Sequence, residues 1–555
     1  MFDSCRVHTQ ICESQGAARR NAGSNAMAEE LENGASVRSD EPQATAVGIW
    51  PAFAHDRFLL ATFCFLSVLA AAPLFLTPFL PLQDLPDHTG LAALMRHVLS
   101  GGEVSRRHYQ LQYFPVPYWT VYSILGLGSW GAGPLVAAKL LTFIAAICTP
   151  LGAIRMAIAL KRSPRVGLCA FAFAWDYNVS WGFLAHVIGF GVALLYLART
   201  IEMMSLRDVW RSSWIGCLLA LTHAHATLVW MAASAVTAFV SKDRRRRLQL
   251  HGLAALAPIL TMLPWIISRI AARAGGKARS PSWPSFSQRW SSLFDHTFFT
   301  FTGPLVPTLL FAVFVTLFLG PPLLGLLGLK HRTKDTHWRI VWGLYGLAWL
   351  LYLTAPSGIY WPINQQFIYQ RQASFIVLLG LFLPAPPLDA RRFTVLVPGL
   401  VAAVLAMVVG IVQVADFGTR AAPFLNIIAA VPRESRILTL TLDDHDPVSK
   451  RTPYNQFHAY IVAEKGGYDP YLFNNPSHPI VFSKAPQPPR PRWNDMAAFS
   501  MQKHAPAFDY IVVQGLTHDP VVQGPIEGTS TYVTRITESG RWRLYRVEHE
   551  APATP

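Results

Sequence analysis

Long apolar runs separated by short polar segments recur along this chain from about residue 58 to about residue 415. A run of roughly 17 to 25 apolar residues is long enough to cross a bilayer as an α-helix. The pattern therefore predicts a polytopic α-helical membrane protein with about eleven transmembrane helices. The expected spans are 58–80, 132–158, 166–182, 183–200, 212–223, 225–240, 250–272, 300–328, 338–356, 373–388 and 393–415.

The apolar runs stop near residue 426, and the pattern changes. The segments "SRILTLTL", "FDYIVVQG" and "RWRLYRV" are typical of short strands, and Pro- and Gly-rich turns separate them. We therefore expect a transmembrane domain over 53–425 and a small soluble α/β domain over 426–555. Residues 1–52 are polar and lack periodicity, which predicts a disordered cytoplasmic N-terminal region.

The composition agrees with a membrane protein, because 52% of the 555 residues are hydrophobic and only 14% are charged. The formal net charge of +15 could suggest nucleic-acid binding. However, the basic residues form short clusters between apolar runs, at 161–165, 244–247, 330–332 and 391–392. Such clusters are typical of the cytoplasmic loops of membrane proteins. We therefore expect the lipid bilayer, and no nucleic acid, as a partner.

The basic clusters also predict the orientation. With a cytoplasmic N-terminus, every cluster falls on the cytoplasmic side and the C-terminal domain lies outside. This requires the run "PVPYWTVYSILGLGSW" (115–130) to be a non-spanning helix or a re-entrant segment. It also requires 212–240 to be a broken hairpin that turns near "LTHAHA". The predicted location is a bacterial inner membrane, with many passes and an extracytoplasmic C-terminal domain.

This orientation collects ionisable residues at the outer face, where charged groups close to hydrocarbon are costly and tend to mark function. Asp84, Asp87 and His88 follow the first span in "QDLPDH". Asp295 and His296 precede the eighth span. The other candidates for substrate binding come from three further outer turns: Asp176, Asn178, His186, His223, His225, Tyr360, Gln365 and Arg371.

The segment after Asp87 has helical periodicity. Apolar residues between Leu91 and Leu99 recur at i, i+3, i+4 and i+7 spacing, with Arg96 and His97 on the opposite face. This pattern predicts an amphipathic helix that lies in the membrane interface and holds the two carboxylates at headgroup depth.

Each candidate also has a structural alternative. Asp84 resembles a helix N-cap, with Asp87 as its capping-box partner. Asp176 could cap a loop end in the same way. His223 and His225 could form a metal pair, but residues at i and i+2 point apart on a helix, which favours a hydrogen-bonded turn.

The aromatic residues of the outer loop at 358–371 have two interpretations of equal weight. Tyr360, Trp361 and Tyr369 could belong to an interfacial aromatic belt, or they could form a platform for a sugar.

The order of these features resembles the GT-C superfamily of integral-membrane glycosyltransferases. A first span leads into an outer loop with paired acids ("QDLPDH"), followed by an amphipathic helix, an acidic outer turn ("WDYN") and a C-terminal extracytoplasmic domain. The superfamily includes oligosaccharyltransferases, protein O-mannosyltransferases and lipid A aminoarabinose transferases. Its signature is usually two adjacent acids, whereas two residues separate Asp84 from Asp87. The C-terminal segment has no WWD-type motif, which argues against an oligosaccharyltransferase.

The resemblance implies that a sugar moves, with inversion, from a polyprenyl-phosphate donor to a lipid, glycan or protein acceptor on the extracytoplasmic face. It implies two catalytic candidates, Asp84 and Asp87, and Asp84 is the first choice for the base that deprotonates the acceptor hydroxyl. Asp87 and Asp176 are candidates for acceptor or metal contacts, and Arg371 and His88 for the phosphate. A divalent cation, Mg or Mn, is an open alternative. We expect the C-terminal domain to shape acceptor access without performing the chemistry.

Two other classes of protein remain as alternatives. A transporter or flippase would place charged residues at mid-membrane and often shows repeated halves. Here the acids gather at one face and no internal repeat is visible, which favours the enzyme. A non-catalytic envelope assembly factor with a GT-C-like fold also remains, because the acid spacing is unusual.

Overall fold

The computed structural model describes residues 48–112, 115–272, 280–298, 301–302, 305–327, 335–360, 365–384, 393–473, 477–493, 495–515 and 519–549. We predicted disorder for residues 1–52, and residues 1–47 of this segment lie outside the described part. The basic clusters at 330–332 and 391–392 lie outside it too, as does Trp361.

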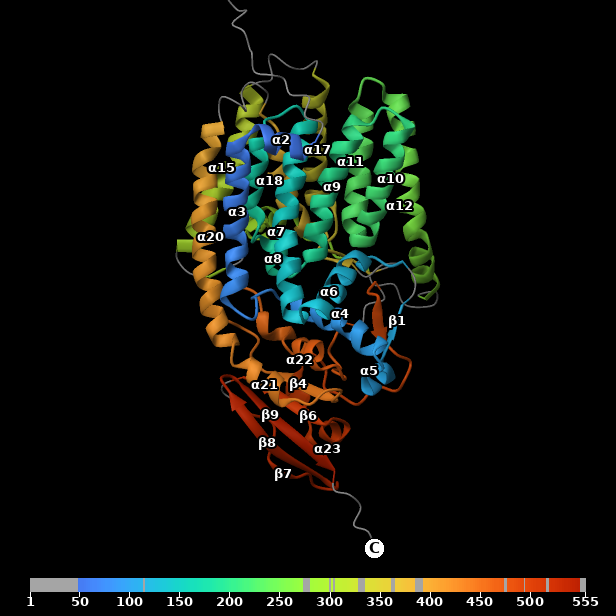
Figure 1. Ribbon diagram of the computed structural model, residues 1–555, viewed down its shortest axis with the longest axis vertical. Helices are drawn as coiled ribbons and strands as arrows, with labels where there is room; N and C mark the ends of the chain where they lie inside the picture. Colours follow the sequence, from blue (N-terminus) through green and yellow to red (C-terminus); the bar gives the residue numbers. More distant parts are fainter. Residues whose placement is uncertain are drawn as a thin grey trace, which may run out of the picture. The chain divides into compact units, whose positions relative to one another are not determined.

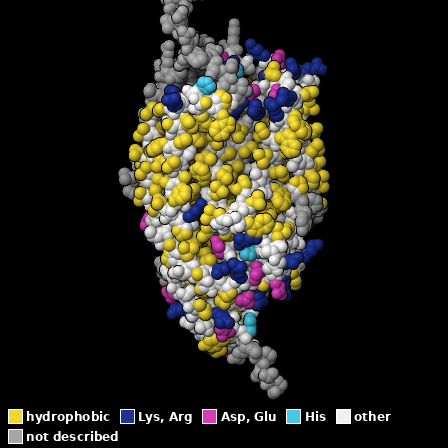
Figure 2. Space-filling model, viewed as in Figure 1, with side chains coloured by type: hydrophobic (Ala, Val, Ile, Leu, Met, Phe, Trp, Pro, Cys, Tyr) yellow, Lys and Arg dark blue, Asp and Glu magenta, His cyan; other side chains and the backbone are white. Residues whose placement is uncertain are grey.

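Six helices of the described part are long and apolar enough to cross a membrane. They are α3 (Arg57–Leu76), α7 (Pro134–Ala159), α9 (Leu184–Glu202), α12 (Arg244–Ala272), α15 (Leu305–Leu327) and α20 (Phe393–Ala421). Apolar side chains such as Val68 and Phe75 are 70% and 84% exposed, and Figure 2 shows hydrophobic side chains covering the surface of the helical region. The chain is a multi-pass membrane protein, as predicted.

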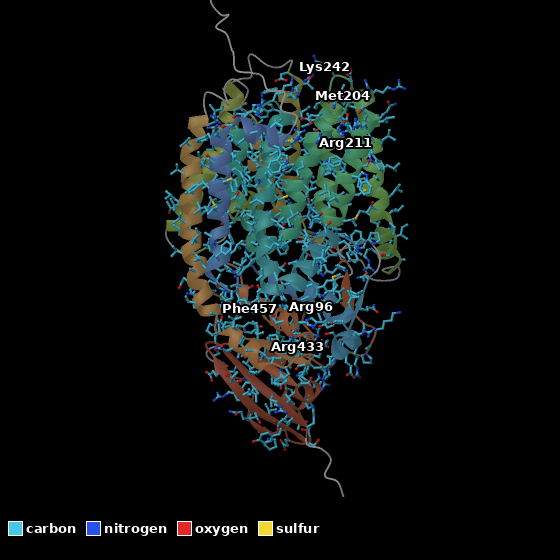
Figure 3. All side chains as sticks on the ribbon, viewed as in Figure 1. Arg96, Met204, Arg211, Lys242, Arg433 and Phe457 are labelled. Atoms are coloured by element: carbon cyan, nitrogen blue, oxygen red, sulfur yellow. The ribbon has the colours of Figure 1, made fainter. Side chains whose placement is uncertain are left out.

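Four further helices complete the bundle: α10 (Leu206–Thr222), α11 (Ala224–Val240), α17 (Thr336–Thr354) and α18 (Ala373–Gly380). The chain breaks at His223, and Met204 and Lys242, which flank α10 and α11, lie at the same end of the bundle (Figure 3). The predicted hairpin is therefore confirmed. The helix α6 (Trp119–Gly131) has 13 residues. At about 1.5 Å per residue it is too short to span, so the predicted non-spanning segment is also confirmed.

The predicted span at 166–182 is not a continuous α-helix. It comprises a ten-residue 3₁₀ helix, η1 (Pro164–Phe173), and one short turn, α8 (Tyr177–Ser180). Gly167 explains part of this difference, because a Cβ atom there would lie 2.5 Å from the backbone nitrogen of Ile154. The segment thus packs backbone against backbone on α7 and returns to the other end of the bundle in few residues.

After α20, the short helix α21 (Phe424–Ala430) leads into a five-stranded sheet. Its order is β4 (Ile437–Thr441), β6 (Tyr510–Gln514), β9 (Trp542–His549), β8 (Thr531–Ser539) and β7 (Gly524–Pro525). The β4–β6 pair is parallel and the other pairs are antiparallel. Figure 1 shows α22 (His458–Lys465) between this sheet and the helical bundle. The predicted fold class, a polytopic helical protein with a C-terminal α/β region, is confirmed.

The remaining elements are short. Two small antiparallel pairs join β1 (Tyr109–Leu111) to β5 (Ile480–Phe482) and β2 (Gly358–Ile359) to β3 (Gln365–Gln366). The others are α2 (Ile49–His55), α5 (Glu103–His108), α13 (Phe286–Ser291), α14 (Leu293–Phe298), η2 (Gln370–Gln372), η3 (Pro453–Gln456), η4 (Met496–Ala498), α23 (Met501–His504) and η5 (Ala505–Ala507).

The amphipathic helix after the first span is present as α4 (Leu85–Leu99), but its apolar face does not contact lipid as we expected. Leu91 and Leu94 are buried by protein rather than by lipid. The helix packs against α6 and α7 and also against α22. Its contact with α22 is close, since a Cβ on Gly90 would lie 2.8 Å from the carbonyl oxygen of Ala459. The apolar stripe predicted a buried face correctly, but protein covers that face.

Candidate functional site

Asp84 lies in the loop between α3 and α4, and the turn after α8 holds its backbone. The N–H of Asp84 donates to the carbonyl of Trp181 at 2.9 Å, and the N–H of Gln83 donates to that of Ser180 at 3.2 Å. Gly182 has φ +81°, and a Cβ there would lie 2.9 Å from the Asp84 nitrogen. A glycine is therefore required at this close approach.

The side chain of Asp84 is not a helix cap, although the residue occupies the N-cap position of α4. It accepts no backbone N–H, so the capping interpretation is wrong for this residue. Its Oδ1 accepts a hydrogen bond from Nε2 of Gln456 at 3.1 Å. Asp84 is half-buried, so the surrounding protein excludes much of the water from its carboxyl. This burial raises the pKa of Asp84 to about 7, against the opposing effects of the Arg371 charge and the Gln456 bond.

Asp87 belongs to a different group of side chains. It is fully buried, and neither carboxylate oxygen has a hydrogen-bond partner. It lies beside His458, whose Nε2 is 3.6 Å from Oδ1 of Asp87 and 3.9 Å from Oδ1 of Asp469. Burial and the charges of Asp84 and Asp469 hold the pKa of Asp87 well above its usual value. Asp87 thus forms a buried cluster with two residues of the C-terminal region.

Arg371 from η2 is the cation of the site. Its side chain is buried, and its guanidinium carbon lies 3.9 Å from the centre of the Phe183 ring. Its Nη1 lies 3.0 Å from Nε2 of His223. The Nδ1 of His223 accepts the backbone N–H of Ala226 at 3.3 Å, at the break between α10 and α11. The predicted hydrogen-bonded turn at this histidine is confirmed.

His186 and His225 lie beside this pair. The ring of His186 is 5.0 Å from that of His223 and 5.5 Å from that of His225. His225 contacts the amide of Gln372. His186, Arg371, Asp176 and Asn178 line one cavity of about 20 Å³, which is room for about one water molecule.

Asp176 is a satisfied cap. Its Oδ1 accepts the N–H of Val179 at 3.0 Å, at the start of α8. Its Oδ2 accepts from Oγ of Ser374 at 2.6 Å and from Nδ2 of Asn178 at 3.1 Å. The alternative of a loop-end cap is confirmed for this residue.

His88 points into an aromatic group on the other side of α4. Its Nδ1 lies 3.0 Å from the Tyr122 hydroxyl, and its ring lies 6.0 Å from that of Tyr118 and 5.6 Å from that of His478. Burial lowers the pKa of His88 to about 4, with a smaller effect from the charge of Arg371, so His88 is neutral near pH 7. Tyr118 connects this group to His223, with its hydroxyl 3.5 Å from Nε2.

Tyr360 and Gln365 lie on the β2–β3 hairpin. This hairpin meets the site through Phe367, whose ring centre is 4.6 Å from that of Trp181 and 5.6 Å from that of Phe183. The assignment of Tyr360 and Gln365 to substrate binding stays a prediction.

Several residues of the site carry no sequence signal that identifies them. Gln456, His458 and His478 come from the C-terminal region, which we expected to lack the chemistry. Arg451 is a second cation at the site, and its guanidinium carbon lies 4.6 Å from the Tyr177 ring centre and 4.7 Å from that of Trp181.

In the part of the chain that the structure describes, no group of three or more His, Cys, Asp or Glu residues could hold a metal ion. The divalent cation stays an expectation.

No protein-family model and no curated protein matches this chain. Among solved structures, it is similar to ArnT from Cupriavidus metallidurans bound to undecaprenyl phosphate. The identity is 12%, the match covers 88% of this chain and 97% of that chain, and the TM-score is 0.49. It is also similar to the arabinofuranosyltransferase AftD from Mycobacteria, with 15% identity over 90% of this chain and 40% of that chain and a TM-score of 0.47.

Similarities at this level concern the course of the chain and say nothing of its chemistry. The features that suggested a GT-C-like architecture are present in the structure itself. A first apolar helix ends at an acidic loop, a buried helix follows, and a sheet region comes after the last apolar helix.

Proposed function

We propose that this chain is a membrane glycosyltransferase that moves a sugar from a polyprenyl-phosphate carrier to an acceptor hydroxyl. The observation that carries the proposal is that Arg371 lies close enough to Asp84 for its positive charge to act on the carboxyl. Asp84 gains and loses its proton near neutral pH, which suits a general base. Arg371 is a buried guanidinium, a group that binds phosphate well.

The proposed reaction is a single displacement. The acceptor oxygen attacks the anomeric carbon while the carboxylate of Asp84 takes its proton. The bond between that carbon and the phosphate oxygen breaks, and the polyprenyl phosphate leaves with the bonding electrons. The positive charge of Arg371 stabilises the negative charge that develops on the phosphate, and Arg451 lies on the aromatic wall nearby. This displacement inverts the anomeric centre.

The size of the cavity beside Arg371 bears on how a sugar could bind. The cavity beside Arg371 has room for about one water molecule, which is far smaller than a sugar. Substrate binding therefore requires the walls of the site to separate. Phe173, His186 and Phe375 are among the residues that form these walls.

We further propose that the protein lies in a bacterial inner membrane with the sheet region outside. Lys242 lies at the end of the helical bundle far from the sheet region, and Arg433 lies near the junction of the bundle and the sheet region (Figure 3). The basic residue Arg165 pairs with Asp56 at the start of α3, with Nε 2.7 Å from Oδ2. Basic residues favour the cytoplasmic side. Reporter fusions after residue 430 should be active outside the cytoplasm, and cytoplasmic activity there would overturn this orientation.

The proposed function is tested with purified protein and a panel of sugars linked to undecaprenyl phosphate. This probe is chosen because ArnT was solved with undecaprenyl phosphate bound. Release of undecaprenyl phosphate reports transfer to any acceptor. The parent protein should release it from at least one donor, and Arg371→Gln should reduce release at least tenfold. The matched control is Arg433→Gln at an exposed position, which should release it at the parent rate. Movement of the intact donor across vesicles without release would indicate a transporter instead.

A further inference from the structure

The C-terminal region places one short segment directly on the two acids of α4. The 3₁₀ helix η3 ends at Gln456, and α22 begins two residues later at His458. Gln456 contacts Asp84, and His458 contacts Asp87. Phe457, between them, lies at the junction of the helical bundle and the sheet region (Figure 3).

Several independent contacts join the C-terminal region to the part of the chain from α4 to β1. Gly90 of α4 meets the backbone of α22 at Ala459, and β1 pairs with β5 beside it. Glu434 accepts hydrogen bonds from both the N–H and the hydroxyl of Ser105, each at 2.8 Å. These contacts join residues more than 300 positions apart in the sequence. The position of Gln456 relative to Asp84 is therefore set by a docked surface, not by one bond.

We propose that Gln456 is a positioning residue for the Asp84 base, so that the C-terminal region completes the active site. The side chain of Gln456 is 4% exposed, and its amide Nε2 donates to Oδ1 of Asp84 at 3.1 Å. Occupation of Oδ1 leaves Oδ2 to accept the proton. The inference rests on the proposed function for its catalytic meaning, but the effect of Gln456 on Asp84 can be measured without a substrate.

The hydrogen bond has a definite effect on ionisation. A donor that faces a carboxylate stabilises the charged form and lowers the pKa of the group. Burial works in the opposite direction at Asp84 and is the larger effect. Removal of the donor would leave the burial uncompensated. The carboxyl of Asp84 would then hold its proton to a higher pH.

The experiment is a pH titration of the full chain in detergent, in which infrared difference spectroscopy monitors the protonation of carboxyl groups. The carbonyl band of the protonated Asp84 carboxyl is assigned by its loss in Asp84→Asn. In Gln456→Met, which keeps the length of the side chain but lacks the donor, the Asp84 midpoint should rise by about one pH unit. In Gln456→Glu a second carboxyl faces Asp84, so the midpoint should rise further. The matched control is Gln487→Met at an exposed position, which should leave it unchanged.

The outcomes separate the two proposals. If both Gln456 variants fold and Asp84 titrates as in the parent, Gln456 has no positioning role and the inference is overturned. If one variant fails to fold, the other still decides the question. If the midpoints shift as expected but no sugar is released by the parent, the proposed function fails while the contact stands. If transfer occurs, the pH dependence of its rate in the Gln456 variants should shift together with the Asp84 midpoint. A purely structural role of Gln456 would not cause this shift.

Discussion

Asp84, which is half-buried, and Asp176, which is buried, are two acids at the same end of the helical bundle, but their surroundings differ. Asp176 accepts three hydrogen bonds, from a backbone N–H, a hydroxyl and a side-chain amide. Asp84 accepts one side-chain hydrogen bond, from a residue 372 positions away, and makes no capping bond. The number and origin of the donors thus distinguish Asp176, a satisfied cap, from Asp84, the proposed base.

The difference has a physical basis. A carboxylate with several local donors is stabilised in place and has little capacity left for a substrate proton. A carboxylate with one donor and a nearby cation keeps an oxygen available to accept a substrate proton. Four changes would break or sharpen this contrast.

The largest effect is expected from Asp84→Asn. The asparagine keeps the size of the side chain and removes the proton acceptor. Loss of a general base typically costs about 10²- to 10⁴-fold in rate. Release of undecaprenyl phosphate should fall by this amount, while the melting temperature stays at or above that of the parent. Near-normal transfer by a folded Asp84→Asn protein would remove Asp84 from the mechanism, and Asp87 would be tested next.

The next effect is the pH dependence. The base must be ionised, and the pKa of Asp84 is about 7, so transfer should fall about tenfold for each pH unit below 7. Stability should change in the opposite direction. The folded pKa lies above the ordinary value of 3.8, so Asp84 contributes most stability below about pH 4 and loses this contribution as pH rises through 7.

Melting curves and transfer rates measured on the same samples from pH 4 to 8 check both trends. Asp84→Asn should lose this part of the pH dependence of melting. If the transfer rate fell only well below pH 6, this result would contradict the assignment of Asp84 as the base.

A smaller effect, on stability, is expected from Asp176→Ala. The substitution removes the cap of α8 and leaves Ser374 and Asn178 without their shared acceptor. We expect about 1 to 3 kcal/mol of destabilisation, measured by thermal or denaturant unfolding. The folded fraction should still transfer sugar within about tenfold of the parent rate. A loss as severe as that of Asp84→Asn would show that the two acids do not differ in the way proposed.

The smallest effect is expected from Asp444→Ala in the "LDDHDP" turn of the C-terminal region. The Asp444 carboxylate pairs with its neighbour His445 at 2.8 Å, and the His445 side chain is 78% exposed. Exposed pairs of this kind contribute roughly 0 to 1 kcal/mol. Transfer and melting temperature should both stay near those of the parent. Asp446, which accepts hydrogen bonds from Arg420 and Tyr454, is the contrasting buried acid of the same turn.

The sequence alone predicted much of the helical region for simple reasons. Apolar length marks a span, so the helices α3, α7 and α9 begin and end within a few residues of the expected positions. The distribution of basic clusters required a break near His223 and a non-spanning segment before residue 130, and both are present. These features depend on residues that are close in sequence, where length, periodicity and local charge are sufficient.

Only the tertiary structure showed which side chains surround the two acids and what covers α4. The spacing of Asp84 and Asp87 suggested a cap, but their partners, Gln456 and His458, come from the distant segment that docks on α4. An apolar stripe requires burial without specifying whether lipid or protein provides it, so the contact between Gly90 and Ala459 could not be predicted. The ionisation of a buried acid depends on every group that surrounds it. The chain assembles those groups only when it folds.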